Sequence, residues 1–206
     1  LVAKYLGEEG RNHSLPLSVK AGFTLGNPMA FDSRNTHAIA SPIIAQGIKI
    51  EILKVFRNLL PMMKLDRYYY RESIYGMLRA WSLADLDRAA CKAFCRNDGN
   101  VFRIGYQDAR DYWKDASSYR YVPFVSVPLL QLTSADDFLV QKSFQHRMYC
   151  NLCNPNVTVI ETACGGHLGW RESTGNFADK VLVEFFTSVL KEDDAKTMNS
   201  HRRSRL

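Results

Sequence analysis

Apolar residues recur at helical spacing in several parts of the chain. The stretches that this spacing predicts as helices are 1–10, 39–60, 72–96, 108–116, 141–152 and 176–191. In the first stretch the residues that share an apolar face are Leu1, Val2, Tyr5 and Leu6. Gly7 or Gly10 is expected to end this helix, because glycine readily adopts the left-handed cap conformation. Within 72–96, Ser82 is a predicted N-cap, with Asp85 three residues further on.

Three short apolar runs predict strands, at 15–23, 127–133 and 157–160. The second and third runs are nearly continuous, which is typical of strands in a buried parallel sheet. They are separated by the predicted helix at 141–152 and by a turn at Asn154-Pro155-Asn156. The last predicted helix follows the third run. Strand, helix, strand and helix with short connections indicate an α/β fold with a mostly parallel sheet.

Carboxylates and a histidine follow two of these predicted strands. Asp136 and Asp137 come after the run at 127–133, and His167 follows the run at 157–160 behind Gly165 and Gly166. Functional groups of parallel sheets lie beyond the carboxyl ends of the strands, so these loops are expected to be neighbours. An aspartate on Nδ1 of an imidazole leaves the other nitrogen free to act as a general base. The alternative is a surface aspartate pair and a loop histidine that never meet.

Composition excludes several classes of protein. The 206 residues are 46% hydrophobic and 23% charged, unlike a disordered or fibrous chain. No apolar run approaches the roughly 18 residues that cross a bilayer. Half of the net charge of +6 comes from three arginines in the tail at 201–206, which we expect to be a solvated, disordered terminus. The charge therefore does not indicate a nucleic-acid-binding protein.

The five cysteines do not predict a metal site. They are Cys91, Cys95, Cys150, Cys153 and Cys164. Neither closely spaced pair has a histidine at a matching short distance, and the pairs lie too far apart for a compact zinc finger. We therefore expect reduced thiols, and neither a metal nor an organic cofactor.

Several motifs together resemble one family. They lie at 127–137, 154–157 and 165–170, and further likenesses occur at 1–7, 27–28, 112–118 and 179–185. The combination resembles the C-terminal half of α/β-hydrolases of the lipase-like and phospholipase-like branch, together with related plant and bacterial esterases. The resemblance covers nearly the whole chain apart from the basic tail. It implies a partial α/β-hydrolase domain over 1–200, with a lid-like helical region at about 39–118 and the tail at 201–206.

The resemblance also assigns roles. His167 corresponds to the catalytic histidine of the family and Asp137 to its acid, with Asp136 as the second choice. The implied activity is hydrolysis of carboxylic esters, with acylglycerols or phospholipids as the substrate class. One departure is Phe138, which stands where the family often has proline.

The nucleophile of this family is the serine of a Gly-x-Ser-x-Gly motif, and the 206 residues contain no such motif. The serines considered for the role lack flanking glycines, and they are Ser117, Ser118, Ser134 and Ser173. By resemblance, the motif would lie just before Leu1. We therefore expect the isolated chain to be inactive and prone to aggregate through an open edge at its first strand. The alternative is a truncated, non-catalytic form that binds lipid or a protein partner.

The helix predicted over residues 43–60 has a second interpretation. Lys49, Lys54 and Arg57 flank its apolar stripe, a pattern that also occurs in helices lying on a membrane surface. Such a stripe is more typical of a core or lid helix.

Overall fold

The computed structural model describes residues 1–31, 40–59, 74–94, 106, 108–140 and 153–203. The chain forms two compact units. The first comprises residues 1–29 with 117–206, and the second comprises residues 30–116. The helix predicted at 141–152 lies outside the described residues.

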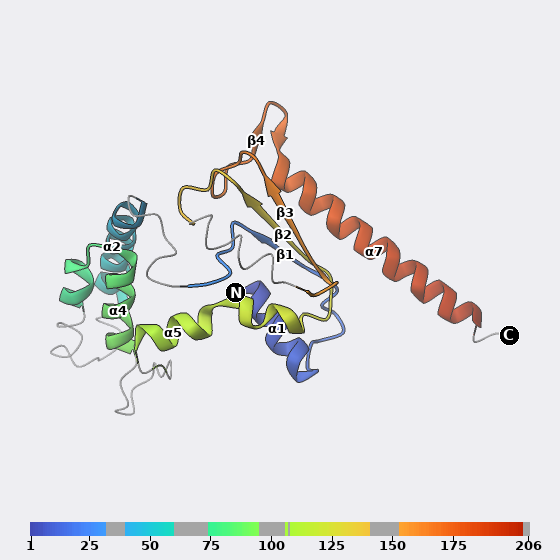
Figure 1. The fold of residues 1–206 in the computed structure, drawn as a ribbon, viewed down its shortest axis with the longest axis horizontal. Helices are drawn as coiled ribbons and strands as arrows, with labels where there is room; N and C mark the ends of the chain where they lie inside the picture. Colours follow the sequence, from blue (N-terminus) through green and yellow to red (C-terminus); the bar gives the residue numbers. More distant parts are fainter. Residues whose placement is uncertain (32–39, 60–73, 95–105, 107, 141–152, 204–206) are drawn as a thin grey trace. The chain divides into compact units, whose positions relative to one another are not determined.

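A parallel sheet of three strands lies at the centre of the first unit (Figure 1). The strands are β1 (Gly22–Leu25), β2 (Leu129–Ser134) and β3 (Val157–Thr162), in the order β1-β2-β3. Leu129 at the start of β2 pairs with Gly22 on one side and Val157 on the other. The parallel α/β arrangement predicted from the sequence is therefore confirmed.

The first strand begins later than predicted. Instead of a strand over 15–23, the chain makes a turn in which the amide of Val19 donates to the carbonyl of Pro16 at 2.9 Å. The chain reaches β2 only after this turn, at Gly22, which pairs with Leu129. The turn at 154–156 and the strand at 157–160 are confirmed, the strand with two further residues.

Helices cover both faces of the sheet. On one face, Leu129 packs with Ala3 and Leu6 of α1 (Val2–Asn12). On the other, Leu132 packs with Trp170 and with Ala178 of α7 (Phe177–Arg203).

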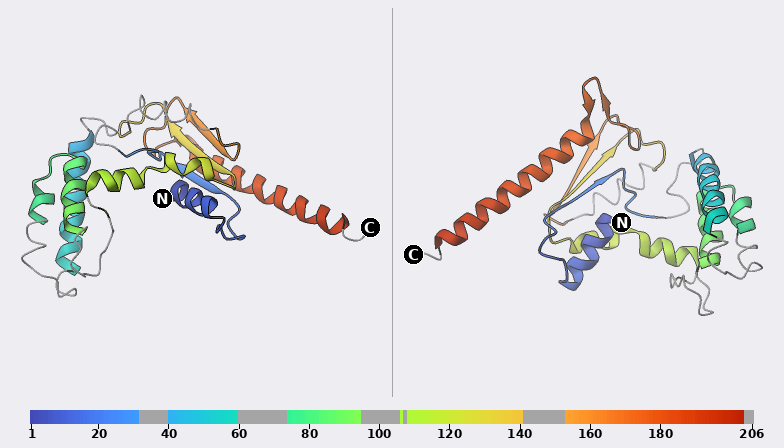
Figure 2. Two further views of the ribbon diagram at one scale, coloured as in Figure 1. Left: turned by 60° about the horizontal axis from the view of Figure 1, so that its bottom comes forward. Right: turned by 180° about the vertical axis from the view of Figure 1, so that it is seen from behind.

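A short hairpin of β4 (Arg171–Glu172) and β5 (Gly175–Asn176) leads directly into α7 (Figure 2). The helix α7 is longer than the predicted 176–191. It includes residues 201–203 of the tail, so the expectation of a disordered tail is wrong for these residues. From Phe177 onward the sequence has no glycine or proline that would end a helix.

The buried face of α1 differs from the predicted one. Its buried residues are Ala3, Leu6, Gly7 and Gly10. Leu1, Val2 and Tyr5 are exposed. Neither glycine ends the helix, because the left-handed cap is His13 with φ 54°.

The two glycines allow α1 to approach the backbone of two short 3-10 helices, η1 (Ser118–Arg120) and η2 (Val122–Phe124). A Cβ atom at Gly10 would lie 2.0 Å from the carbonyl oxygen of Phe124, and one at Gly7 would lie 2.3 Å from that of Tyr121. The lack of a side chain at these positions therefore serves packing, a requirement that helical spacing does not reveal.

Replacement of Gly10 by alanine is expected to destabilise the protein. Helix propensity alone predicts a gain of about 1 kcal/mol, but the clash with the Phe124 carbonyl should cost about 1–3 kcal/mol. Gly47→Ala is the matched control, because a Cβ there would meet nothing within 4 Å. Urea unfolding followed by circular dichroism measures both. Equal stabilisation by the two substitutions would contradict the close approach of α1 to η2.

The second unit is helical, with α2 (Ala40–Leu59), α4 (Leu83–Phe94), α5 (Ala109–Ala116) and a helical segment at 74–79. The helix predicted over 72–96 is interrupted at Ser82, where a capping box starts α4. The amide of Asp85 donates to the Ser82 hydroxyl at 3.1 Å, and the amide of Ser82 donates to the Asp85 carboxylate at 3.3 Å. The predicted N-cap is therefore confirmed, and it explains the break because a capping residue leaves helical geometry.

Apolar side chains of α2 face solvent. Ile43, Ile50 and Leu53 are exposed, and so are Lys54 and Arg57. Contact of this helix with a membrane surface stays a prediction. Among the described residues, no helix is both long enough and apolar enough to pass through a bilayer.

Candidate active site

The carboxyl ends of the three parallel strands carry the residues of the candidate site. β2 ends at Ser134 and continues into Asp136 and Asp137, and β3 ends at Thr162, five residues before His167. The amide of Ala135 donates to the Thr162 carbonyl at 2.8 Å, which extends the pairing of β2 and β3 by one residue. The aspartates and the histidine therefore leave the sheet from neighbouring strands.

Asp137 and His167 are in direct contact. Oδ2 of Asp137 lies 2.9 Å from Nδ1 of His167. Oδ1 of the same carboxylate accepts hydrogen bonds from the amides of Leu139 at 2.8 Å and Val140 at 3.2 Å. The Asp137 side chain is 5% exposed and that of His167 is 23% exposed. The acid is thus held in place, and the imidazole is still accessible.

This contact selects one form of the imidazole. A carboxylate accepts from Nδ1–H, so the neutral ring carries its proton on Nδ1 and presents a lone pair on Nε2. Nε2 has no hydrogen-bond partner within the part of the chain that the structure describes. The ring can therefore accept a proton on Nε2 next to a carboxylate that stabilises the resulting imidazolium.

Asp136 contacts the backbone before the histidine rather than the imidazole. Its Oδ1 accepts from the amide of Gly166 at 2.7 Å and from the hydroxyl of Ser134. The Ser134 hydroxyl, followed by the Gly166 amide, lowers the pKa of the Asp136 carboxyl, because both stabilise the charged form. The two adjacent acids therefore have different partners, and only Asp137 contacts His167.

Trp170 supports the loop that carries the histidine. Its side chain is buried, and the indole Nε1 donates to the Thr162 hydroxyl at 2.8 Å. The ring lies so close to Gly165 that a Cβ there would be 2.3 Å from Nε1. The sequence leaves open whether Trp170 and Phe138, which flank the predicted site, shape it or only pack. In the structure Trp170 is buried in the core, whereas Phe138 is exposed.

Gly26, which directly follows β1, contributes to the site in a way that the sequence does not reveal. Its φ is +51°, and a Cβ there would lie 2.6 Å from the His167 carbonyl oxygen and 3.0 Å from Nδ1. Glycine adopts this conformation without strain, and its lack of a side chain leaves space for the histidine. The signal in the sequence is a glycine between an apolar run and Asn27-Pro28, a pattern that by itself indicates only a loop.

Among the described residues, no serine hydroxyl forms a hydrogen bond with Nε2 of His167. Ser117 and Ser118 are buried, Ser134 donates to Asp136, and Ser173 is exposed in the turn of the β4–β5 hairpin. In the same residues, no group of three or more histidine, cysteine or acidic side chains could hold a metal ion. The structure therefore brings together an acid and a base.

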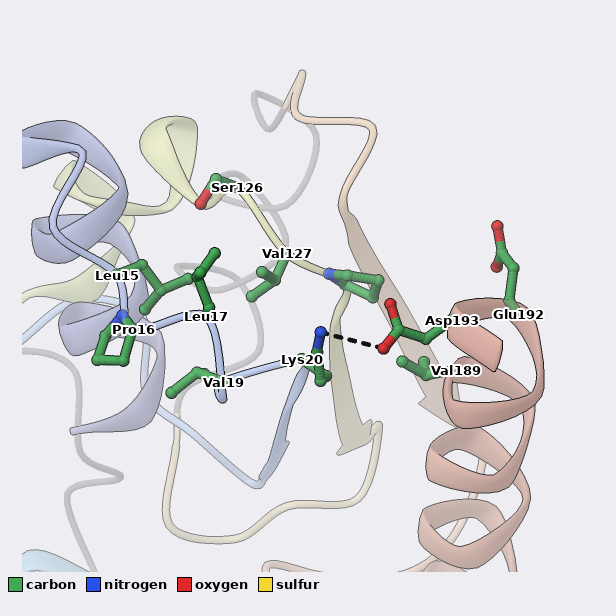
Figure 3. Close-up of a pocket in the computed structure, with 11 residues that line it drawn as sticks. Leu15, Pro16, Leu17, Val19, Lys20, Ser126, Val127, Val189, Glu192 and Asp193 are labelled. Carbon is green, nitrogen blue, oxygen red and sulfur yellow. Dashed lines mark ion pairs between the residues drawn. The ribbon is translucent and has the colours of Figure 1, made fainter. Parts of the chain in front are cut away.

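A groove of about 340 Å³ lies at the opposite end of the sheet, where the segments that lead into β1 and β2 meet α7 (Figure 3). Its apolar lining includes Leu15, Pro16, Val19, Val127, Pro128 and Val189. An ion pair of 3.0 Å between Lys20 and Asp193 joins the β1 segment to α7. The groove contains none of the candidate site residues.

No family model matches the chain, but several known proteins are similar to it. The chain is 26% identical to the monoacylglycerol lipase of Saccharomyces cerevisiae over 172 residues, which are 82% of the chain and 35% of the yeast protein. It is 32% identical to phospholipase ABHD3 of Mus musculus over 201 residues, 93% of the chain and 44% of that protein. It is 31% identical to monoacylglycerol lipase ABHD2 of Danio rerio over 139 residues, 62% of the chain and 33% of that protein. The chain therefore spans less than half the length of these curated relatives.

Proposed function

Because this chain is homologous to α/β-hydrolases of the lipase and phospholipase branch, we propose that it supplies the acid and base of a serine esterase. The homology confirms the relationship that the motifs predicted. The observation that carries the proposal is the contact of 2.9 Å between Asp137 and His167, at the carboxyl ends of two parallel strands.

The geometry supports a general-base mechanism. Nε2 of His167 takes the proton of a serine hydroxyl as the serine oxygen attacks the ester carbonyl, and Asp137 stabilises the imidazolium that forms. The same Nε2–H then protonates the leaving alcohol. In the second half of the reaction His167 takes a proton from water, the hydroxide attacks the acyl-serine, and the serine oxygen regains the proton as the acid leaves.

Two exposed apolar side chains favour an apolar substrate. Phe138 directly follows Asp137 and Leu168 directly follows His167, and each is 61% exposed. Apolar side chains at this position can contact an acyl chain next to the reacting ester. The named relatives are monoacylglycerol lipases and a phospholipase. We therefore propose acylglycerols or phospholipids as the substrate class.

We propose that the serine of this mechanism lies outside the 206 residues. The support is that the sequence contains no Gly-x-Ser-x-Gly motif and that the relatives are more than twice as long as the aligned region. The amide of the residue after that serine, which contributes to the oxyanion hole, would lie outside as well. A chain without both elements retains almost no catalysis.

A fluorophosphonate probe tests this proposal. The purified chain of 206 residues is expected neither to react with the probe nor to hydrolyse p-nitrophenyl butyrate above the buffer rate. A longer form that includes an upstream Gly-x-Ser-x-Gly serine is expected to do both. Labelling of any serine in the shorter chain would contradict the placement of the nucleophile. A longer form that is not labelled would favour the non-catalytic, lipid-binding alternative.

A further inference from the structure

The two aspartates after β2 contact successive parts of one loop. Asp137 contacts the His167 ring, and Asp136 accepts from the amide of Gly166, the residue immediately before it. One turn of the chain therefore contacts both the backbone and the side chain that define the position of the imidazole.

The loop needs such a contact because of its glycines. Gly165 has φ +155° and Gly166 has φ +58°, and both values are accessible mainly to glycine. Two consecutive glycines lose more conformational freedom on ordering than any other pair of residues. A charge-assisted hydrogen bond from the Gly166 amide can offset that loss.

The Asp136 carboxylate is itself anchored. The same Oδ1 that accepts from Gly166 also accepts from the hydroxyl of Ser134, the last residue of β2. This hydroxyl links the carboxylate to the sheet, so the Gly166 amide is held relative to β2. Asp136 is exposed and is not in contact with the imidazole, which distinguishes its role from that of Asp137.

We propose that Asp136 is a positioning residue that holds the Gly165-Gly166 turn, so that His167 keeps its Nδ1–H on Asp137. The catalytic meaning of this role rests on the proposed esterase function. The role itself concerns the conformation of the loop, and its test does not depend on hydrolysis.

The test measures the share of the Nδ1–H tautomer of His167. Nitrogen-15 chemical shifts of the five histidine rings are recorded in the chain of 206 residues at about pH 9, where imidazole groups are neutral. The His167 signals are assigned by comparison with His167→Ala. In the unmodified chain, His167 is expected to be mainly in the Nδ1–H form. In Asp137→Asn, the share of this form is expected to fall.

Asp136→Ala is expected to lower the Nδ1–H share about twofold or more, because loss of one charge-assisted hydrogen bond shifts a local equilibrium by about tenfold. Asp136→Asn should retain most of the share, since its amide oxygen still accepts from Gly166. Asp194→Ala, an exposed aspartate on α7, is the control and should have no effect. General destabilisation would lower the unfolding midpoint without changing the tautomer of the folded chain.

Two results would overturn the proposal. One is an unchanged tautomer in Asp136→Ala. The other is an equal loss in Asp136→Ala and Asp136→Asn, which would mean that the charge of Asp136 acts through space. If Asp136→Ala does not fold, Ser134→Ala replaces it, because it removes the anchor of the carboxylate. A partial loss of the Nδ1–H form supports the proposal in that variant, and no loss contradicts it.

Discussion

If the proposed function holds, replacement of His167 by alanine is expected to abolish ester hydrolysis in a longer form of the chain that includes the proposed serine. The imidazole is the only base that the described residues place on the Asp137 carboxylate. Without it, neither the serine hydroxyl nor the leaving alcohol can exchange its proton through Nε2. Losses of about 10⁴-fold to 10⁶-fold in kcat are typical when a triad histidine is removed. The measurement is kcat and KM for p-nitrophenyl butyrate, with fluorophosphonate labelling in parallel.

Two further variants make this result specific. Asp137→Asn should lower kcat by about 10⁴-fold, because an amide at this position favours the wrong tautomer of the imidazole. The control is His13→Asn. His13 is the left-handed C-cap of α1, and asparagine also tolerates this conformation. The control should retain full activity. A loss of less than tenfold in His167→Ala would exclude this histidine as the general base.

Trp170→Ala is expected to cause the largest loss of stability, about 3–5 kcal/mol in the free energy of unfolding. Trp170 is 4% exposed and packs between β2 and α7 in a cluster with Leu132 and Ala178. Its removal leaves a cavity there, takes away the hydrogen bond to Thr162 and opens space beside Gly165. A typical domain is stable by only about 5–15 kcal/mol, so this loss is a large fraction of the total.

Urea unfolding followed by far-ultraviolet circular dichroism measures the effect. Trp170→Phe is the matched variant, because it keeps an aromatic ring in the core and removes the five-membered ring with its N–H. It should cost about 1–3 kcal/mol, the usual effect of losing one partner of a buried hydrogen bond. If Trp170→Ala cost less than about 1 kcal/mol, the side chain would not support the core between β2 and α7.

Elements that depend on residues close together in the chain were predicted from the sequence, whereas features that depend on long-range pairing were not. Apolar runs and helical spacing located β2, β3, α2 and α5 within a few residues, and the Ser82–Asp85 capping box was recognised from two residue types at the right separation. These features are local, because each depends on residues that are close in the chain. The start of β1 was missed because it depends on where Pro16 and its turn allow the chain to reach β2.

The sequence by itself therefore determined the α/β class, the family, and the acid and histidine loops of the candidate site. Asp136 and Asp137 are chemically identical neighbours, so the residues alone do not distinguish them. The family resemblance preferred Asp137, and the tertiary structure shows that it is Asp137 that contacts His167. The partners of the two aspartates are set by the turn after β2, which directs one carboxylate to the Gly166 amide and the other to the imidazole. Close backbone approaches decided the roles of Gly10 and Gly26 in the same way. Periodicity locates helices and strands along the chain, but the packing partner of a side chain and the space available to it come only from the packed fold.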